Sequence, residues 1–280
     1  MRRIFLSLTA AGAIGSAAFA SDLPDRQAPP PALPAAAPAV SWAGFYGGLN
    51  AGYGWGEAPV SLSGDPGGLF EGGVTAGVLP TSIAARPQGL VGGAQVGWNS
   101  HAGGIVWGVE GDFDYAGVRD GGTVVTPFGL YPASIGVPRT LRGAQSLDWL
   151  STARLRLGFT PTDRLLIFAT GGGAAGGGGV SVSLTTNDIG GVPGSGCAAG
   201  TCENQSVSKT LLGWSAGFGA EYAIGGAWSL GAEYLHYDLG RASATAWDPT
   251  WGPRTNITTG AERVSGDIAR ATLNYRFGGL

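Results

Sequence analysis

The sequence predicts an all-β fold: an eight-stranded antiparallel up-and-down transmembrane β-barrel with short periplasmic turns and long extracellular loops. Eight segments alternate between apolar and polar residues, which is the pattern of a strand with one apolar face. The connections between them alternate between short and long, as in outer-membrane barrels. Beyond the N-terminal twenty residues, no stretch reaches the ~18 apolar residues of a membrane helix. A membrane-spanning chain without such a helix has to be a closed barrel.

Each of the eight segments exceeds the strand length of about 5–6 residues that is common in globular proteins. The fifth alternates poorly, so its register stays open, and we assign it because its neighbours require a strand. The predicted strands are 43–55, 90–99, 105–115, 146–159, 164–176, 208–222, 228–238 and 267–277. The predicted short turns are 100–103, 160–163 and 224–227, and the long loops are 57–88, 116–144, 177–206 and 241–263.

Charged residues lie on the strand face opposite the apolar one, where they line the barrel interior. An eight-stranded barrel is just wide enough for side chains to fill it, so these groups are expected to meet as salt bridges. In particular, we expect Arg154 or Arg156 to pair with an acid on the third strand. A narrow, charged, water-filled path is the alternative. The predicted lumen charge network comprises Glu110, Asp112, Asp114, Asp148, Arg154, Arg156, Glu221, Glu233, Arg270 and Arg276.

The N-terminus has the layout of a secretory signal peptide over residues 1–20. Arg2 and Arg3 precede a short apolar stretch, and cleavage is predicted between Ala20 and Ser21. Residues 21–41 are rich in Pro and Ala, which favours a semi-rigid periplasmic tether. Contact with the cell wall is a second interpretation of this segment. The barrel domain is then 42–280.

The two cysteines, Cys197 and Cys202, fall in the third long loop. In an exported protein this spacing favours one disulfide at a loop tip. A metal half-site is the alternative, but no second pair of ligands completes it.

Several segments together resemble the small porin-like outer-membrane proteins of alphaproteobacteria, over about residues 43–277. The resemblance implies a barrel in the cell outer membrane, with structural, porin or host-contact roles. It also implies recognition of the C-terminal strand by the barrel-assembly machinery, although Phe277 is followed here by Gly-Gly-Leu. The segments that carry it are SWAGFYGGLNAGYGWG, GGIVWGVEGDFDYAG, LDWLSTARLRLGF, LLIFATGGGAAGG, LGWSAGFGAEYAIGGAWSLGAEYLHYDLG and ATLNYRF.

Composition and motifs argue against other classes of function. The formal net charge of −3 does not suggest a nucleic-acid partner. No HExxH, no GxSxG and no Ser/His/Asp set occurs on plausible elements, so we predict no enzyme and no cofactor. The two histidines, His101 and His236, fit a polar turn and a membrane interface.

The expected function is therefore structural: support of the envelope and presentation of surface loops, with outer-membrane lipid and lipopolysaccharide as partners. A small porin is the first alternative. A recognition module acting through its loops is the second, because exposed aromatics such as Trp247 and Trp251 suit either ligand contact or packing across the barrel mouth.

Overall fold

The computed structural model describes residues 40–57, 59–64, 71, 74–75, 77, 80–126, 139–186, 203–246, 257–261 and 263–277. The barrel lies in the compact unit Ala39–Leu280. The signal peptide, most of the tether, and both Cys197 and Cys202 lie outside the described residues, and so these assignments stay predictions.

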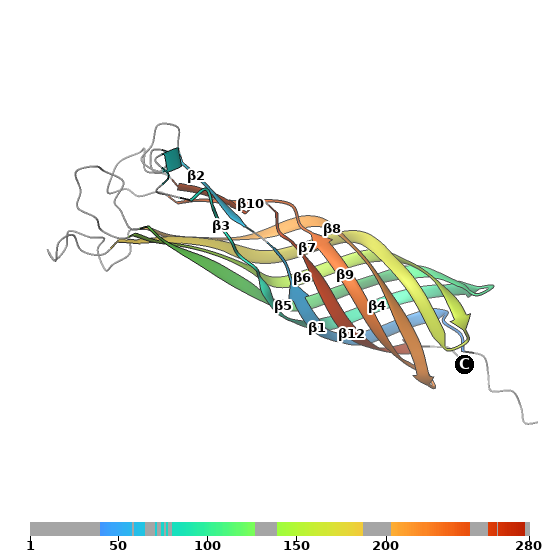
Figure 1. Ribbon diagram of the computed structural model, residues 1–280. Coiled ribbons are helices and arrows are strands. Elements are labelled where there is room, and N and C mark those ends of the chain that lie inside the picture. Colours follow the sequence, from blue (N-terminus) through green and yellow to red (C-terminus); the bar gives the residue numbers. More distant parts are fainter. Residues whose placement is uncertain are drawn as a thin grey trace, which may run out of the picture. The chain divides into compact units, whose positions relative to one another are not determined.

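Eight strands form a closed barrel in which every neighbouring pair is antiparallel, so the predicted fold class is confirmed (Figure 1). The order around the barrel is β1-β12-β9-β8-β7-β6-β5-β4. The barrel strands are β1 Gly44–Trp55, β4 Gln88–Ala102, β5 Ile105–Thr126, β6 Arg139–Thr162, β7 Leu165–Thr186, β8 Glu203–Gly225, β9 Trp228–Asp238 and β12 Ser265–Phe277.

Tight turns at one end of the barrel join β4 to β5, β6 to β7 and β8 to β9. In the first, Gly103 and Gly104 have φ of 60° and 83°. Two successive positive φ angles are what a two-residue hairpin turn of the primed type needs, and glycine adopts them without strain. The three turns, at 103–104, 163–164 and 226–227, begin two or three residues after the predicted starts and finish within one residue of the predicted ends. We call this the turn end and the opposite one the loop end.

Four strands extend five or more residues further at the loop end than the sequence predicts. β5 runs to Thr126 instead of 115 and β7 to Thr186 instead of 176, while β6 begins at Arg139 and β8 at Glu203. These strands therefore continue at the loop end beyond β1, β4, β9 and β12 (Figure 1). The predicted loops 116–144 and 177–206 are correspondingly too long. The outward face of these extensions is mostly polar, so the alternation of apolar and polar residues ends there. The hydrogen-bonded pairing of the strands nevertheless continues to their ends.

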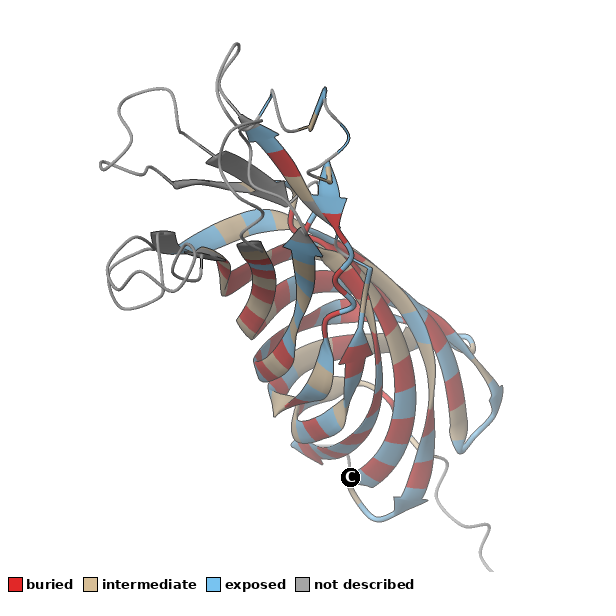
Figure 2. Cartoon of the chain, turned by 60° about the vertical axis from the view of Figure 1, so that its left-hand side comes forward, coloured by how far each residue is buried: buried red, intermediate tan, exposed pale blue. Residues whose placement is uncertain are grey.

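Burial alternates along the barrel strands, but the apolar side faces out (Figure 2). Leu90, Leu155 and Leu212 are 73%, 70% and 77% exposed, whereas Arg154 and Asp114 are 2% and 0% exposed. Such a surface would be costly in water, at about 25 cal/mol per Å² of apolar area. Aromatic side chains border the apolar band at both ends. We call those toward the loop end the loop-end girdle: Tyr53, Trp55, Tyr115, Trp149, Trp214 and Tyr234.

A second sheet that the sequence did not predict covers the loop end. Its order is β10-β11-β2-β3, with β2 Val60–Gly64, β3 Ser82–Ile83, β10 Ala242–Ala246 and β11 Ile257–Ala261. Leu62 and Ile83 of this sheet pack with Leu141 of β6 and Val182 of β7. The extended strands thus bury apolar residues inward against the loop sheet. Among the described residues, no helix has the length and apolar character to cross a membrane.

Candidate functional site: the closed lumen

The middle of the barrel is filled by ion-paired side chains, which we call the lumen network. Three arginines and five acids form it, and their side chains are at most 5% exposed. All of them were placed on the inward face from sequence alternation. The members are Glu110, Asp112 and Asp114 of β5, Arg154 and Arg156 of β6, Glu221 of β8, Glu233 of β9 and Arg270 of β12.

Arg154 joins two opposite sides of the barrel. Its Nη2 lies 2.7 Å from Glu110 Oε1 and 2.7 Å from Asp112 Oδ2, both on the neighbouring strand. Its Nη1 pairs with Glu233 of β9 and donates to Thr170 Oγ1 at 3.0 Å. The expected pairing of Arg154 with the third strand is therefore present, and the same guanidinium also reaches across the lumen.

Arg270 makes a second crossing from β12. Its Nη1 lies 2.8 Å from Asp114 Oδ2, and its Nη2 lies 2.8 Å from Asp112 Oδ2 and 2.7 Å from Glu233 Oε2. Asp112 and Glu233 are each shared with Arg154. Charge-assisted pairs of this kind are among the stronger hydrogen bonds, and sharing acceptors couples all of the groups into one unit.

Arg156 extends the network toward the turn end. It pairs with Glu221 and lies 3.5 Å from Glu110 Oε2. The Tyr46 hydroxyl donates to Glu110 at 2.6 Å and accepts from Arg156 at 3.1 Å. The guanidinium also lies 3.7 Å from the centre of the Phe168 ring, a cation–π contact.

Neutral side chains surround the network: most of them donate to its remaining oxygens, while Gln95 bonds to Asn50 and Asn274. They were not predicted as part of it, although their inward position in the alternation carries that signal. With them, each of the eight barrel strands contributes to the lumen. They are Tyr46 and Asn50 of β1, Gln95 of β4, Thr152 of β6, Thr170 of β7, Ser229 of β9 and Asn274 of β12.

The prediction that Asp148 belongs to the lumen network is wrong. The register of β6 against β7 shifts between Leu147 and Trp149, so Asp148 is the extra residue of a β-bulge. It lies 3.0 Å from Arg119, with the two side chains 42% and 62% exposed. One extra residue in a strand sends the side chains beyond it to the opposite face of the sheet. The alternation of apolar and polar residues alone does not show where such a residue lies.

Arg276 is buried as predicted but stands apart from the ion pairs. Its guanidinium lies 4.5 Å from the centre of the Trp42 ring, and its Nη1 and Nη2 have no hydrogen-bond partner in the described part of the chain. Trp42 is 1% exposed and donates its indole N–H to the Asp163 carbonyl at 3.3 Å. The residues just before β1 therefore enter the turn end of the lumen.

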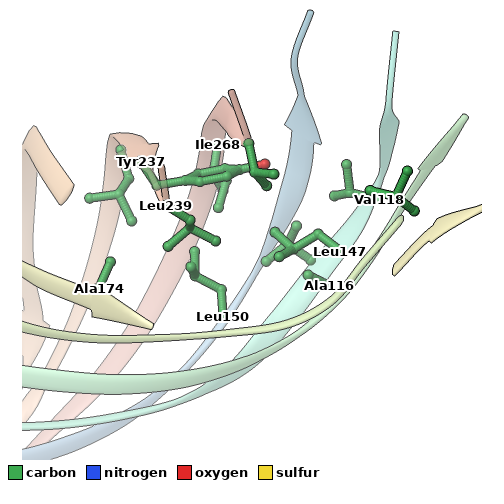
Figure 3. Packing of buried hydrophobic residues seen from close by; sticks show 12 residues of the cluster. Ala116, Val118, Leu147, Leu150, Ala174, Tyr237, Leu239 and Ile268 are labelled. Carbon is green, nitrogen blue, oxygen red and sulfur yellow. The ribbon is translucent and has the colours of Figure 1, made fainter. Parts of the chain in front are cut away.

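Apolar layers lie on both sides of the network. At the turn end, Trp42 packs with Val106, Leu166, Phe168 and Ala223. At the loop end, a larger cluster fills the lumen with side chains from opposite walls (Figure 3). A cavity of about 20 Å³ lined by residues of β6, β7 and β8 has room for about one water molecule. The larger cluster comprises Val91, Ala116, Val118, Leu147, Leu150, Ala174, Val180, Leu235, Tyr237, Leu239, Val264 and Ile268.

Gly97 of β4 gives a test of how tightly the network is packed. A Cβ at this position would overlap the Tyr46 ring, with Cε1 at 2.7 Å and other ring atoms closer. Gly97→Ala is expected to displace Tyr46 from Glu110 and to lower the free energy of unfolding by about 1–3 kcal/mol. Gly173→Ala is the matched control, because nothing lies within 4 Å of a Cβ there. Urea unfolding in lipid vesicles measures both, and equal stability of the two variants would contradict the packing argument.

A smaller polar cluster lies on the outer face of β9 and β12, at the loop-end girdle. His236 Nδ1 is 2.8 Å from Asp267 Oδ1, and the Tyr234 hydroxyl donates to the same oxygen at 2.7 Å. The His236 ring lies 5.5 Å from that of Trp214. These groups face away from the lumen, which agrees with the predicted interface position of His236. In the described part of the chain, no group of three or more His, Cys, Asp or Glu residues is arranged to hold a metal ion.

Comparisons with known proteins agree with this architecture. A family model described as an outer membrane protein beta-barrel domain matches residues 28–277. A 31 kDa outer-membrane immunogenic protein of Brucella melitensis is 32% identical over 280 residues, which cover 99% of this chain and 100% of the relative. A 25 kDa outer-membrane immunogenic protein of Brucella abortus is 38% identical over 99 residues, which cover 35% of this chain and 38% of that protein.

Among solved structures, the outer membrane protein OprG from Pseudomonas aeruginosa matches 84% of this chain and 97% of its own. The sequence identity is 9% and the TM-score is 0.46.

Proposed function

Because the chain belongs to the outer membrane protein beta-barrel domain family and resides in the cell outer membrane, we propose that it is a sealed structural barrel that supports the envelope and presents its loops at the cell surface. In this family, the turn end is periplasmic and the loop end extracellular. The observation that carries the proposal is the filled lumen, in which the network lies between two apolar layers.

Opening a path for solutes would require several strong contacts to break together. Arg154 and Arg270 share Asp112 and Glu233, so moving one guanidinium leaves buried carboxylates with fewer partners. Leaving a buried charge unpaired costs about 3–5 kcal/mol. The apolar clusters at either end would then still block ions, because apart from the Tyr237 hydroxyl and the Trp42 indole N–H their side chains offer no polar groups to replace water. These energies favour a structural role over a small porin.

Single-channel recording in a planar bilayer tests the sealed lumen. The exported chain, refolded and shown to be folded by its heat-dependent mobility on a gel, is expected to give no discrete current steps. A large-pore porin in the same bilayer serves as the positive control for detection. Reproducible current steps from the folded chain would favour the porin alternative, because a filled interior is expected to pass no ionic current.

Surface presentation is the second half of the proposal. The loop sheet lies beyond the girdle and is held by Leu62 and Ile83 against the extended strands. The two Brucella relatives are named as immunogenic outer-membrane proteins, which supports exposure of this end to the outside. We further assign β12, with Tyr275 and Phe277 facing outward, as the strand recognised by the barrel-assembly machinery.

A further inference from the structure

The outer face of β5 and β6 changes character above the loop-end girdle. Up to that level it is apolar, and the ring of the girdle residue Trp149 stacks on that of Phe113 at a centroid distance of 5.8 Å. Above it, Arg119 of β5 and Arg142 of β6 are exposed on the outward face. The other outward residues of β5, β6 and β7 at this level are mostly small or carry hydroxyl groups; they include Thr123, Ser146, Ser181 and Ser183.

The two sides of the barrel differ in charge at the extracellular interface. On the outward face of the extended β5–β7 segments, Asp148 is the one carboxylate among the described residues. On the opposite side, next to the shorter strands, charges of both signs reach the surface. They include Asp267 of β12, Glu57 just after β1, and the exposed Arg241 and Arg263, the latter 3.4 Å from Asp238. The outer face of β5 and β6 thus presents two arginines and one carboxylate, a local excess of positive charge that suits an anionic partner.

The lipid that surrounds an outer-membrane barrel at this level is lipopolysaccharide, whose headgroup carries phosphates and sugar hydroxyls. An arginine matches a phosphate with two parallel N–H bonds, and hydroxyl side chains suit the sugars. We propose that the outer face of β5 and β6 binds the headgroup phosphates of lipopolysaccharide through Arg119 and Arg142. This inference deepens the proposed envelope role, since it needs the barrel embedded with its loop end outside.

Asp148 sets the strength of this contact. It holds Arg119 through Nη2 at 3.0 Å, in a pair that is exposed on both sides. Exposed pairs of this kind contribute little stability, so a phosphate can take the place of the carboxylate. The bulge places the carboxylate outward, beside Arg119, instead of in the lumen. Asp148 therefore competes with the lipid for the same guanidinium.

Native mass spectrometry of the full exported chain in detergent tests the proposal, with lipid A carrying two phosphates and chemically dephosphorylated lipid A as the probes. The wild-type chain is expected to prefer the phosphorylated form. The double variant Arg119→Gln, Arg142→Gln is expected to bind it about tenfold more weakly, the size of two exposed ion pairs. Asp148→Asn is expected to bind it more tightly, because the competing carboxylate is gone.

Arg164→Gln is the matched control, since Arg164 is exposed in a periplasmic turn at the other end of the barrel. It is expected to bind phosphorylated lipid A as the wild type does. Equal binding of both lipid forms, or an equal loss in Arg164→Gln and in the double variant, would overturn the proposal. These outcomes are independent of channel recording, because a conducting barrel would refute the sealed lumen and leave the lipid preference unchanged.

Discussion

Arg154→Met is expected to lower the free energy of unfolding by about 3–5 kcal/mol, the typical result of removing one partner from a buried ion pair. The side chain is 0% exposed and its guanidinium contacts Glu110, Asp112 and Glu233. Methionine fills much of the same volume, so the loss comes chiefly from the carboxylates, which keep only their contacts with Arg156, Arg270 and neutral donors. Urea unfolding in lipid vesicles, followed by tryptophan fluorescence, measures it.

Arg119→Met is the control, because its pair with Asp148 is exposed and is expected to contribute no more than about 1 kcal/mol. A double-mutant cycle of Arg154→Met with Glu110→Gln isolates the pair itself, and its coupling energy is expected to be well above zero. A loss for Arg154→Met no larger than for Arg119→Met, or a cycle without coupling, would show that the lumen groups do not act as one network.

Trp42→Ala is expected to cost about 3–5 kcal/mol, as the loss of a buried Trp side chain does in a packed core. Trp42 packs with Val106, Leu166 and Phe168 at the periplasmic end of the lumen. Its ring also covers the guanidinium of Arg276 at 4.5 Å, a cation–π contact that the variant removes. The same urea unfolding assay checks the value.

Trp42→Phe separates packing from hydrogen bonding. It keeps an aromatic ring but removes the indole N–H that donates to the Asp163 carbonyl, so a loss near 1 kcal/mol is expected. An unchanged stability for Trp42→Ala would show that the segment before β1 does not fill the lumen in the membrane. It would contradict the proposal that Trp42 and its apolar neighbours close the periplasmic end of the barrel.

Local pattern was enough to place most of the lumen residues. In a strand, successive side chains alternate between the two faces, so Glu110, Asp112 and Asp114 had to share a face opposite Trp107 and Val109. The same rule applied to the arginines of β6 and β12. It failed at Asp148, because the extra residue of the bulge reverses the inward and outward assignments beyond it, so that Leu147 and Gln145 are buried. The alternation rule also predicted ends of β5 and β7 that are too early. Beyond the predicted ends the outward face becomes mostly polar, but the strands remain paired with their neighbours.

The amino-acid sequence by itself determined that each strand has one apolar and one charged face, because that property depends only on the period of the strand. Together with the alternation of short and long connections and the lack of an apolar helix, it was enough to predict a membrane barrel with the charges inside. The tertiary structure alone decided which charges meet. Arg154 reaches Glu233 across 79 residues and Arg270 reaches Asp114 across 156, through strand register and closure of the barrel. Closure also sets Trp42 beneath the network, and these long-range contacts turn an inward row of charges into a filled interior.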